Sequence, residues 1–297
     1  MTFSSVEQTT SALAATGYLV DSSLAMSVYL SEALGKPILL EGPAGTGKTE
    51  LAKAVAEITG AELIRLQCYE GLDEARALYE WNYRKQLLRI QSTQRAIGGE
   101  ADREASEWSE LHDDIFSEEF LLERPLLRAI RSEQKVVLLI DEIDKADVEV
   151  EGLLLEVLSD FQVTIPELGT LTASTQPYVV LTSNATRELS EALKRRCLYS
   201  HVGYPDPARE IAIVLARVPG FNNALARSIV RTINAMRDLD LRKRPSVAET
   251  IDWAQALQTL GVSELSEEVI DLTLGVVLKH VSDQNKVSEM LGLDRKS

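Results

Sequence analysis

Short apolar runs alternate with helix-like spacings over the first two thirds of the chain. A continuous apolar run that stops at a turn or at polar residues is typical of a parallel strand buried on both faces. Apolar side chains three or four positions apart indicate helices between these runs. The predicted strands cover residues 37–41, 62–66, 136–140 and 178–182, and the predicted helices cover the first 35 residues in one or two pieces, 48–59 and 150–158.

A different pattern follows the helix predicted over residues 150–158. Between Phe161 and Thr172 apolar and polar side chains first alternate with a period of two, and residues 166–169 contain Pro and Gly. Alternation indicates a half-buried strand, and Pro and Gly favour a turn. We therefore expect a β-hairpin here.

The stretch from about residue 70 to 120 is long and polar. We expect a helix plus an insertion, with the insertion centred on residues 92–118. Pro125 stands where the next helix can begin, because proline is favoured at the first helical position.

The chain changes character after the Pro-Asp-Pro sequence at 205–207. Several amphipathic helices and no strand are expected there, and Ser246 and Glu249 have the spacing of a capping box. Strands that alternate with helices, followed by helices alone, indicate an α/β domain and then a small helical one. We place these domains at residues 1–204 and 205–297.

Composition and charge narrow the class of protein. The 297 residues suffice for one large and one smaller domain, and 45% hydrophobic with 26% charged residues is ordinary for a globular protein. The formal net charge of −15 disfavours a general nucleic-acid binder, because an acidic surface repels phosphate backbones. Cys68 and Cys197 allow no disulfide framework and have no metal-ligand neighbour at useful spacing, so we expect ordinary buried thiols.

The sequence also predicts a location. Residues 1–5 lack a basic segment followed by an apolar one, so no secretory signal is apparent. No apolar run is long enough to cross a bilayer. We expect a cytoplasmic protein without stable membrane insertion.

A phosphate-binding loop is the most specific motif. Gly42-Pro43-Ala44-Gly45-Thr46-Gly47-Lys48-Thr49 fits the pattern G-x-x-x-x-G-K-[ST], between a predicted strand and a predicted helix. Glycines let backbone N–H groups wrap a phosphate, and the helix adds its positive N-terminal end. Lys48 can reach the β- and γ-phosphates, and the Thr49 hydroxyl can bind Mg²⁺. ATP and Mg²⁺ are the expected ligands.

Two acids stand at the tip of the buried strand 136–140. Ligands of open parallel sheets bind at this carboxyl edge. Asp141 can join the Mg²⁺ shell and Glu142 can polarise an attacking water, which favours hydrolysis. The alternative is that this acid pair has no function and is simply exposed to solvent where the strand ends. Asp144 and Lys145 are interpreted as a local surface pair.

Three further polar residues have two interpretations each. Asn184 ends the strand 178–182 and could contact the γ-phosphate or position the water, or it could form an Asx turn. Arg195 and Arg196 end a helical stretch, where cations complement the helix dipole. The alternative is an arginine finger given in trans to a neighbouring subunit's nucleotide.

Together these residues resemble an AAA+ ATPase. Gly42–Thr49 resembles the Walker A motif, Leu138–Glu142 the Walker B motif and Asn184 sensor 1, while Arg195 and Arg196 resemble the arginine-finger region. The hairpin at Phe161–Thr172 resembles the pre-sensor insertion of the clade that includes the MoxR family and magnesium-chelatase ATPase subunits. The resemblance implies an α/β fold, a P-loop NTPase with a five-stranded parallel sheet between helices, and a small all-α lid.

Three further strings resemble the CoxD-like branch of the MoxR family, the accessory ATPases of carbon-monoxide-dehydrogenase maturation. These strings are residues 67–73, 79–83 and 158–166. The resemblance implies a homo-hexameric ring with ATP between subunits, a von Willebrand factor A (VWA) domain partner, and a chaperone role toward a client metalloenzyme, a molybdenum hydroxylase.

The sequence departs from the family at sensor 2. Many relatives carry an arginine after a proline at the start of a lid helix, whereas here Ser246 follows Pro245. Arg242 and Arg244 are the candidates, with Arg244 preferred as a nucleotide contact. Plain surface charges near the capping box are the alternative.

Other functions remain open for this sequence. One is a nucleotide-dependent binding switch or scaffold with little turnover. Another is a chelatase-like motor subunit for metal insertion, and a DNA-directed motor is disfavoured by the charge.

Overall fold

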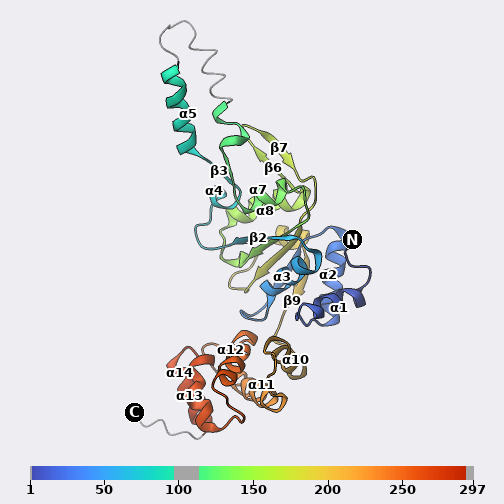
Figure 1. Cartoon of the computed structure of the whole chain (residues 1–297), viewed down its shortest axis with the longest axis vertical. Helices are drawn as coiled ribbons and strands as arrows, with labels where there is room; N and C mark the ends of the chain where they lie inside the picture. The colour runs from blue at the N-terminus through green and yellow to red at the C-terminus, as the bar shows by residue number, and fades with distance from the viewer. Residues whose placement is uncertain (1, 97–113, 292–297) are drawn as a thin grey trace. The chain divides into compact units, whose positions relative to one another are not determined.

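A five-stranded parallel sheet lies in the α/β part of the chain (Figure 1). Its strand order is β2-β5-β8-β1-β9. The structure is a computed structural model that describes residues 2–96 and 114–291. Four of the strands confirm the expected ones: three extend one residue further, and the first begins one residue later than predicted. They are β1 (Ile38–Glu41), β2 (Glu62–Gln67), β5 (Val136–Asp141) and β8 (Tyr178–Ser183).

The fifth strand, β9 (Leu198–His201), was not located from the sequence. It lies at the edge of the sheet, and of its four residues only Ser200 is buried. An edge strand with one buried position has no apolar run to reveal it. By contrast, all six residues of β5 are buried, which is why its apolar run was informative.

Helices surround the sheet where the spacing of apolar residues predicted them. The described elements before the sheet and between its strands include α1 (Val6–Ala15), α2 (Ser22–Leu34), α3 (Lys48–Thr59), α7 (Pro125–Arg131), α8 (Val148–Asp160) and α9 (Glu191–Arg196). α3 buries Leu51, Ala52 and Val55, and the chain leaves it at Gly60, whose φ of +63° suits glycine. α7 begins at Pro125 as expected and packs on β2 and β5.

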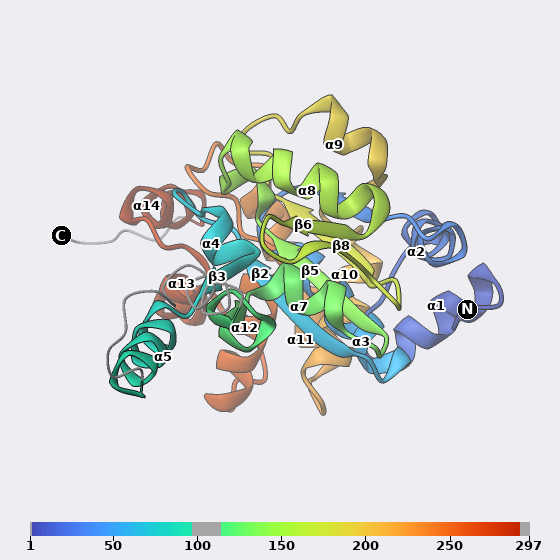
Figure 2. The ribbon, with the colours of Figure 1, turned by 90° about the horizontal axis from the view of Figure 1, so that it is seen from above.

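The predicted hairpin is confirmed. β6 (Gln162–Ile165) pairs antiparallel with β7 (Gly169–Thr172), with Val163 opposite Leu171. Figures 1 and 2 both place this hairpin beside α8, which it contacts. Val163 and Ile165 are buried in the same core as α8, so one face of the hairpin is anchored.

The polar region after β2 contains more regular structure than expected. Its elements are α4 (Glu74–Ala77), β3 (Tyr79–Trp81), α5 (Tyr83–Ala96), the 3-10 turn η1 (Glu118–Phe120) and β4 (Leu121–Glu123). β3 and β4 pair antiparallel, and the Trp81 ring meets the Phe116 ring edge-on at 5.2 Å. Residues 97–113 of the predicted insertion lie outside the described residues.

The chain divides into two compact units. One contains Leu30–Leu39 and Thr59–Tyr199, and the other contains Thr2–Tyr29, Leu40–Ile58 and Ser200–Ser297. β1 and β9 therefore contribute residues to both units, and α3 lies almost wholly in the second. The domain boundary between residues 204 and 205 stays a prediction.

Helices alone follow β9 within the described part of the chain, as expected. They are α10 (Pro207–Arg217), α11 (Asn223–Arg237), α12 (Val247–Thr259), α13 (Glu267–Val277) and α14 (Val281–Met290). They share one core of mainly aliphatic side chains around the fully buried Trp253, whose Nε1 donates to Thr273 Oγ1 at 2.8 Å. The Glu249 carboxylate accepts from the backbone N of Ser246 at 3.0 Å, the capping-box contact that the spacing predicted. None of the helices described in residues 2–96 and 114–291 is long and apolar enough to cross a membrane.

A buried ion pair fastens three of these helices. Arg237 of α11 donates from both Nη atoms to Glu210 of α10, at 2.7 and 2.8 Å, and its Nε donates to Pro245 O at 2.8 Å. Thr250 Oγ1 of α12 donates to the same Glu210 carboxylate at 2.8 Å. Glu210 is fully buried and Arg237 is 7% exposed, so each charge depends on the other for compensation.

Glu210→Ala should destabilise the helical region strongly, because it leaves the Arg237 guanidinium buried without its counter-charge. We expect a loss of about 3–5 kcal/mol in the free energy of unfolding, measured by urea denaturation. The control is Arg227→Ala, which removes an exposed α11 side chain whose contact is with Asn223 in the preceding turn. A loss for Glu210→Ala as small as that of the control would contradict the role of this pair.

Candidate functional site

The phosphate loop connects β1 to α3, the context predicted for it. Gly45 has a φ of +73°, which favours glycine, and an added Cβ there would lie 2.1 Å from Ser246 Oγ at the start of α12. An added Cβ at Gly42 would lie 2.1 Å from Val202 O. Gly45 O also accepts from Ala248 N at 3.2 Å. The loop is therefore packed directly against residues from the C-terminal part of its own unit.

Lys48 is 5% exposed and its ammonium group is turned into the loop. Its Nζ donates to Gly42 O at 2.8 Å and to Pro43 O at 2.7 Å. Thr46 Oγ1 also donates to Pro43 O, at 3.0 Å. A phosphate group offers the same oxygen acceptors as these carbonyls, so the loop provides a buried cation that an anion can compete for.

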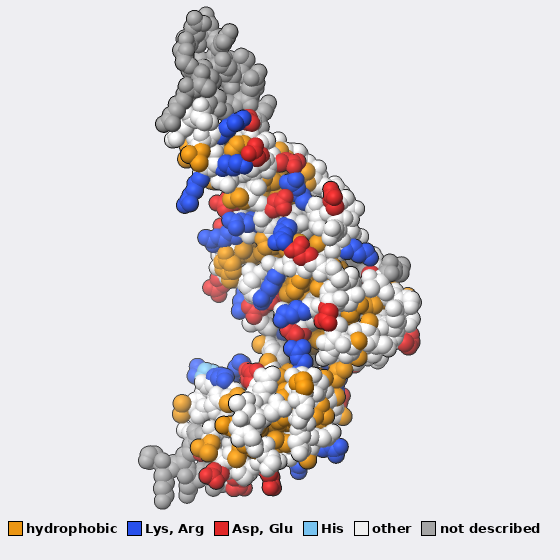
Figure 3. Space-filling model, in the orientation of Figure 1, with side chains coloured by type: hydrophobic (Ala, Val, Ile, Leu, Met, Phe, Trp, Pro, Cys, Tyr) orange, Lys and Arg blue, Asp and Glu red, His pale blue; other side chains and the backbone are white. Residues whose placement is uncertain are grey.

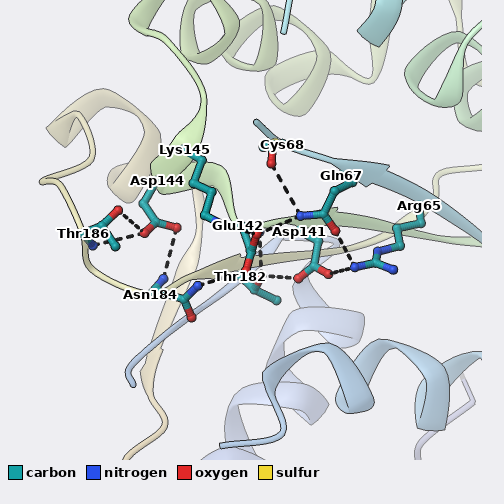
Figure 4. Close-up of polar contacts among 10 residues, drawn as sticks. All are labelled: Arg65, Gln67, Cys68, Asp141, Glu142, Asp144, Lys145, Thr182, Asn184 and Thr186. Carbon is teal, nitrogen blue, oxygen red and sulfur yellow. Dashed lines mark hydrogen bonds and ion pairs between the residues drawn. The ribbon is translucent and has the colours of Figure 1, made fainter. Parts of the chain in front are cut away.

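The second polar group gathers at the end of β5, in the other unit (Figure 4). Asp141 is the last residue of the strand and is 2% exposed. Its Oδ1 accepts from Thr182 Oγ1 at 2.5 Å, and its Oδ2 pairs with Arg65 Nη2 at 2.5 Å. A buried carboxylate is tolerable only with such compensation, and here β8 and β2 supply it.

Glu142 follows in a left-handed backbone conformation, with φ 57° and ψ 48°. Such a conformation costs free energy for a residue other than glycine and gathers at functional sites. It separates the two neighbouring carboxylates, because Glu142 leaves the strand direction and its side chain is 32% exposed. Three donors hold that carboxylate: Lys145 Nζ at 2.7 Å, Gln67 Nε2 at 2.9 Å and Asn184 Nδ2 at 3.2 Å.

Asn184 therefore contacts Glu142 directly, as expected if both belong to one site at the carboxyl edge of the sheet. The alternative of an Asx turn at Asn184 does not hold, because the amide two residues on, Thr186 N, donates to Asp144 Oδ2 at 3.0 Å instead. The backbone N of Asn184 donates to Asp144 Oδ1 at 3.1 Å. The Asn184 amide is therefore free to point at the Glu142 carboxylate.

The interpretation of Asp144 and Lys145 as a surface pair was wrong. Asp144 is 3% exposed and accepts from Asn184 N, from Thr186 N at 3.0 Å and from Thr186 Oγ1 at 2.6 Å. Burial raises the pKa of Asp144, but these hydrogen bonds outweigh it and hold the pKa below its ordinary value. Lys145 pairs with Glu142 instead. Asp144 fixes the loop that carries Asn184.

Arg65 and Gln67 were not singled out from the sequence. They occupy alternate positions of β2, and the parallel register puts Gln67 opposite Asp141. The arginine also donates to Gln67 Oε1. The sequence shows that Arg65 and Gln67 are two residues apart, but only the β2–β5 register shows which acidic residues they contact.

The two cysteines behave as ordinary thiols. Cys68 is buried and Cys197 is partly buried. Burial raises the pKa of each thiol to about 12, and the Asp141 charge adds to the effect at Cys68. Both are protonated at neutral pH, which disfavours nucleophilic or redox chemistry.

The predicted arginines take no part in the hydrogen bonds described above. Arg196 ends α9 and donates to Ala192 O at 3.1 Å and to Ser159 Oγ at 2.5 Å, as a helix-end cation does. Arg195 is exposed and makes no hydrogen bond or ion pair within the described ranges. Arg242 and Arg244 are exposed too, and Ser246 is the residue that meets the phosphate loop.

Thr49 in one unit and Asp141 in the other each carry the kind of oxygen donor that suits a magnesium ion. No cluster of three or more His, Cys, Asp or Glu side chains that could hold a metal occurs in the described part of the chain. Thr49 and Asp141 offer hard oxygen ligands, and Mg²⁺ is usually held by one or two carboxylates together with substrate phosphates and water.

Exposed and half-buried charges on the α/β part pair with one another. Arg131 pairs with Glu118 and Arg124 with Glu80, each at 2.6 Å, and Arg128 pairs with Glu62. On the face that Figure 3 shows, acidic and basic side chains are interspersed. Pairs of this kind contribute little stability, and they neutralise the basic side chains locally.

Solved structures and curated sequences similar to the chain were found. A point mutant of RuvB from Thermotoga maritima matches with a TM-score of 0.48 and 16% identity, covering 91% of this chain and 80% of that one. The Thermotoga maritima RuvB Holliday junction branch migration motor matches with a TM-score of 0.45 and 17% identity, covering 92% and 68%. Likeness at this level supports no functional inference.

Two uncharacterized proteins of Staphylococcus aureus are similar over 180 residues. The one from strain bovine RF122 / ET3-1 is 28% identical and the one from strain USA300 is 27% identical, and each match covers 58% of this chain. The chain matches only 57% of the length of these relatives.

Asp144→Asn should destabilise the protein, because an amide cannot accept all the hydrogen bonds that converge on the carboxylate. We expect a loss of about 1–3 kcal/mol at pH 7, measured by urea denaturation. The pKa of Asp144 is lowered by folding, so its stabilisation is complete above the unfolded-state pKa of about 3.9 and is lost as the pH falls through the folded pKa.

The difference between the wild type and Asp144→Asn should therefore stay constant from about pH 7 to pH 5 and shrink below about pH 4. Asp147→Asn, at an exposed helix-capping position where Asn is equally suitable, is the matched control. A difference that grows on acidification would contradict this account.

Family membership rests on the domain that contains both polar groups. A family model described as AAA domain (dynein-related subfamily) matches residues 37–197, more than half of the 297-residue chain. The match includes the phosphate loop, the acidic end of β5 and Asn184. The chain is therefore a member of the dynein-related subfamily of AAA-domain proteins.

Proposed function

We propose that this protein hydrolyses ATP with Mg²⁺ and works as a ring that remodels a client. Glu142 is the observation that carries the proposal. Its carboxylate is accessible beside the buried Asp141, and its backbone conformation and three donors hold it at the carboxyl edge of the sheet. Membership in the AAA family supports nucleotide as the ligand, because one matched domain contains the phosphate loop and this acid.

The residues divide the work by burial and chemistry. The loop amides of residues 42–49 and the Lys48 ammonium bind the phosphates, and Thr49 and Asp141 hold Mg²⁺. The metal, when bound, offsets the negative charge of the phosphate oxygens. Glu142 accepts a proton from the attacking water, and Asn184, which contacts Glu142, orients that water.

The finer proposal concerns the branch and its partners. Residues 67–73, 79–83 and 158–166 support assignment to the CoxD-like branch of the MoxR family. We propose a homo-hexameric ring, a VWA-domain partner and a role in maturation of a metalloenzyme such as a molybdenum hydroxylase. Arg195 or Arg196 is proposed to reach the nucleotide of the next subunit, and the exposure of Arg195 supports this role.

Glu142→Gln should retain ATP binding and lose hydrolysis, because an amide keeps the shape of the side chain but does not accept the proton. We expect turnover to fall by about 100-fold or more, measured as phosphate release with Mg²⁺ saturating. Nucleotide affinity, measured with a fluorescent ATP analogue, should change little.

Two variants bracket that result. Lys48→Ala should abolish nucleotide binding, and Glu149→Gln, an exposed acid in the first turn of α8, should match the wild type. Turnover by Glu142→Gln at the wild-type rate would reject Glu142 as the base. Tight binding without turnover in the assembled wild type would indicate a nucleotide-dependent switch.

Mixing inactive variants tests the trans arginine. Lys48→Ala cannot bind nucleotide but keeps its arginines, and the double variant Arg195→Ala/Arg196→Ala keeps its nucleotide site. ATP turnover by each variant alone should be at least about 10³-fold slower than that of the wild type, because an arginine finger contributes about 10³-fold or more. The mixture should recover activity, because some interfaces then combine an intact site with an intact arginine.

The same mixtures should be sized by light scattering. Mixed assemblies that stay inactive would exclude Arg195 and Arg196 as trans residues. Full activity in the double variant alone would exclude them as well.

A further inference from the structure

The Arg65–Asp141 contact joins an exposed side chain to a buried one. The Arg65 side chain is 52% exposed, whereas that of Asp141 is 3% exposed. Nη2 of the arginine lies 2.5 Å from Oδ2 of the aspartate (Figure 4). The exposed partner can leave with little change in its own hydration, but the buried carboxylate then needs another positive charge.

The position of Arg65 follows from the sheet. Arg65 is paired in register with Leu139, two residues before Asp141 on the neighbouring strand β5. Its side chain therefore reaches along the strand direction to the carboxylate. Arg128 forms an equivalent contact at the other end of β2, with Glu62, but both of those side chains are more than half exposed.

A metal ion and a guanidinium compete at such a carboxylate. Both are cations, so their mutual repulsion disfavours simultaneous contact with one buried oxygen. Thr182 holds Oδ1 with a neutral hydroxyl and adds no charge. Arg65 is therefore a positive charge that a metal at Asp141 would have to displace from Oδ2.

The same arginine is connected to Glu142. It donates to Gln67 Oε1, while Gln67 Nε2 donates to Glu142 Oε2 at 2.9 Å. Movement of Arg65 away from both Asp141 and Gln67 removes one of the partners of the Gln67 amide. A change at the buried acid is thereby transmitted to the exposed one.

We propose that Arg65 is a stand-in cation: it compensates Asp141 while no metal is bound and is displaced when Mg²⁺ arrives with nucleotide. The competition sets the Mg²⁺ concentration at which the site loads. Arg65 is a positioning residue in this proposal, which rests on the proposed Mg²⁺-dependent nucleotide binding.

The first measurement is a Mg²⁺ titration of binding of a fluorescent ATP analogue. Arg65→Gln should lower the midpoint Mg²⁺ concentration about fivefold or more, because the competitor is gone. Arg65→Lys should lie between the two, since it keeps the charge without the planar guanidinium. Arg128→Gln makes the same change in net charge near the other end of β2 and should leave the midpoint at the wild-type value.

The second measurement is the thermal midpoint of unfolding, Tm, with and without Mg²⁺ and nucleotide. Arg65→Gln should lower Tm in the absence of both, and the gap to the wild type should close when both are added, because the metal then compensates Asp141. A merely structural arginine would lower Tm equally in the two conditions.

The outcomes separate this inference from the function on which it rests. Mg²⁺-dependent binding in the wild type with an unchanged or higher midpoint in Arg65→Gln would overturn the stand-in role alone. Failure of the wild type to bind nucleotide with Mg²⁺ would overturn the proposed function and the stand-in role together.

Discussion

Three carboxylates within four residues at the end of β5 must each be compensated. Asp141 and Asp144 are almost fully buried and Glu142 lies between them, so uncompensated charges there would repel one another at low dielectric. Each receives a different kind of partner. Asp141 has a hydroxyl and a guanidinium, Glu142 has an ammonium and two amides, and Asp144 has mainly backbone N–H groups.

This requirement explains why β2, β8 and the loop after β8 are arranged around β5. The Thr182 hydroxyl accepts from Glu142 N at 2.9 Å and donates to the Asp141 carboxylate. One hydroxyl therefore holds both the side chain of Asp141 and the backbone of the next residue. Asp144 holds the backbone of Asn184 and Thr186, which sets where the Asn184 amide points. The left-handed Glu142 is stable because these contacts determine its conformation from both sides.

Much of this arrangement could be predicted from the sequence. Buried parallel strands are continuous apolar runs, so the strand before Asp141 and the edge where it ends were identifiable, as was the loop at Gly42–Thr49. β9 could not be found, because an edge strand with one buried residue has no such run. Asp144 was misjudged because an acid beside a lysine also suits a surface, and only the fold brings Thr186 to it. Arg65 and Gln67 needed the strand register, which local pattern does not contain.

The phosphate loop packs against residues that lie outside the segment matched by the family model. The family-matched segment ends at residue 197, but the loop's glycines are packed against Val202 and Ser246, both beyond that limit. A chain shortened to the matched segment would keep Gly42–Thr49, the acidic end of β5 and Asn184, and would lose the residues against which the loop packs. Change at position 246 is likewise restricted to side chains that tolerate the backbone of Gly45 at close range. The shape of the phosphate loop therefore depends on two residues, Val202 and Ser246, that lie outside the segment by which the family is identified.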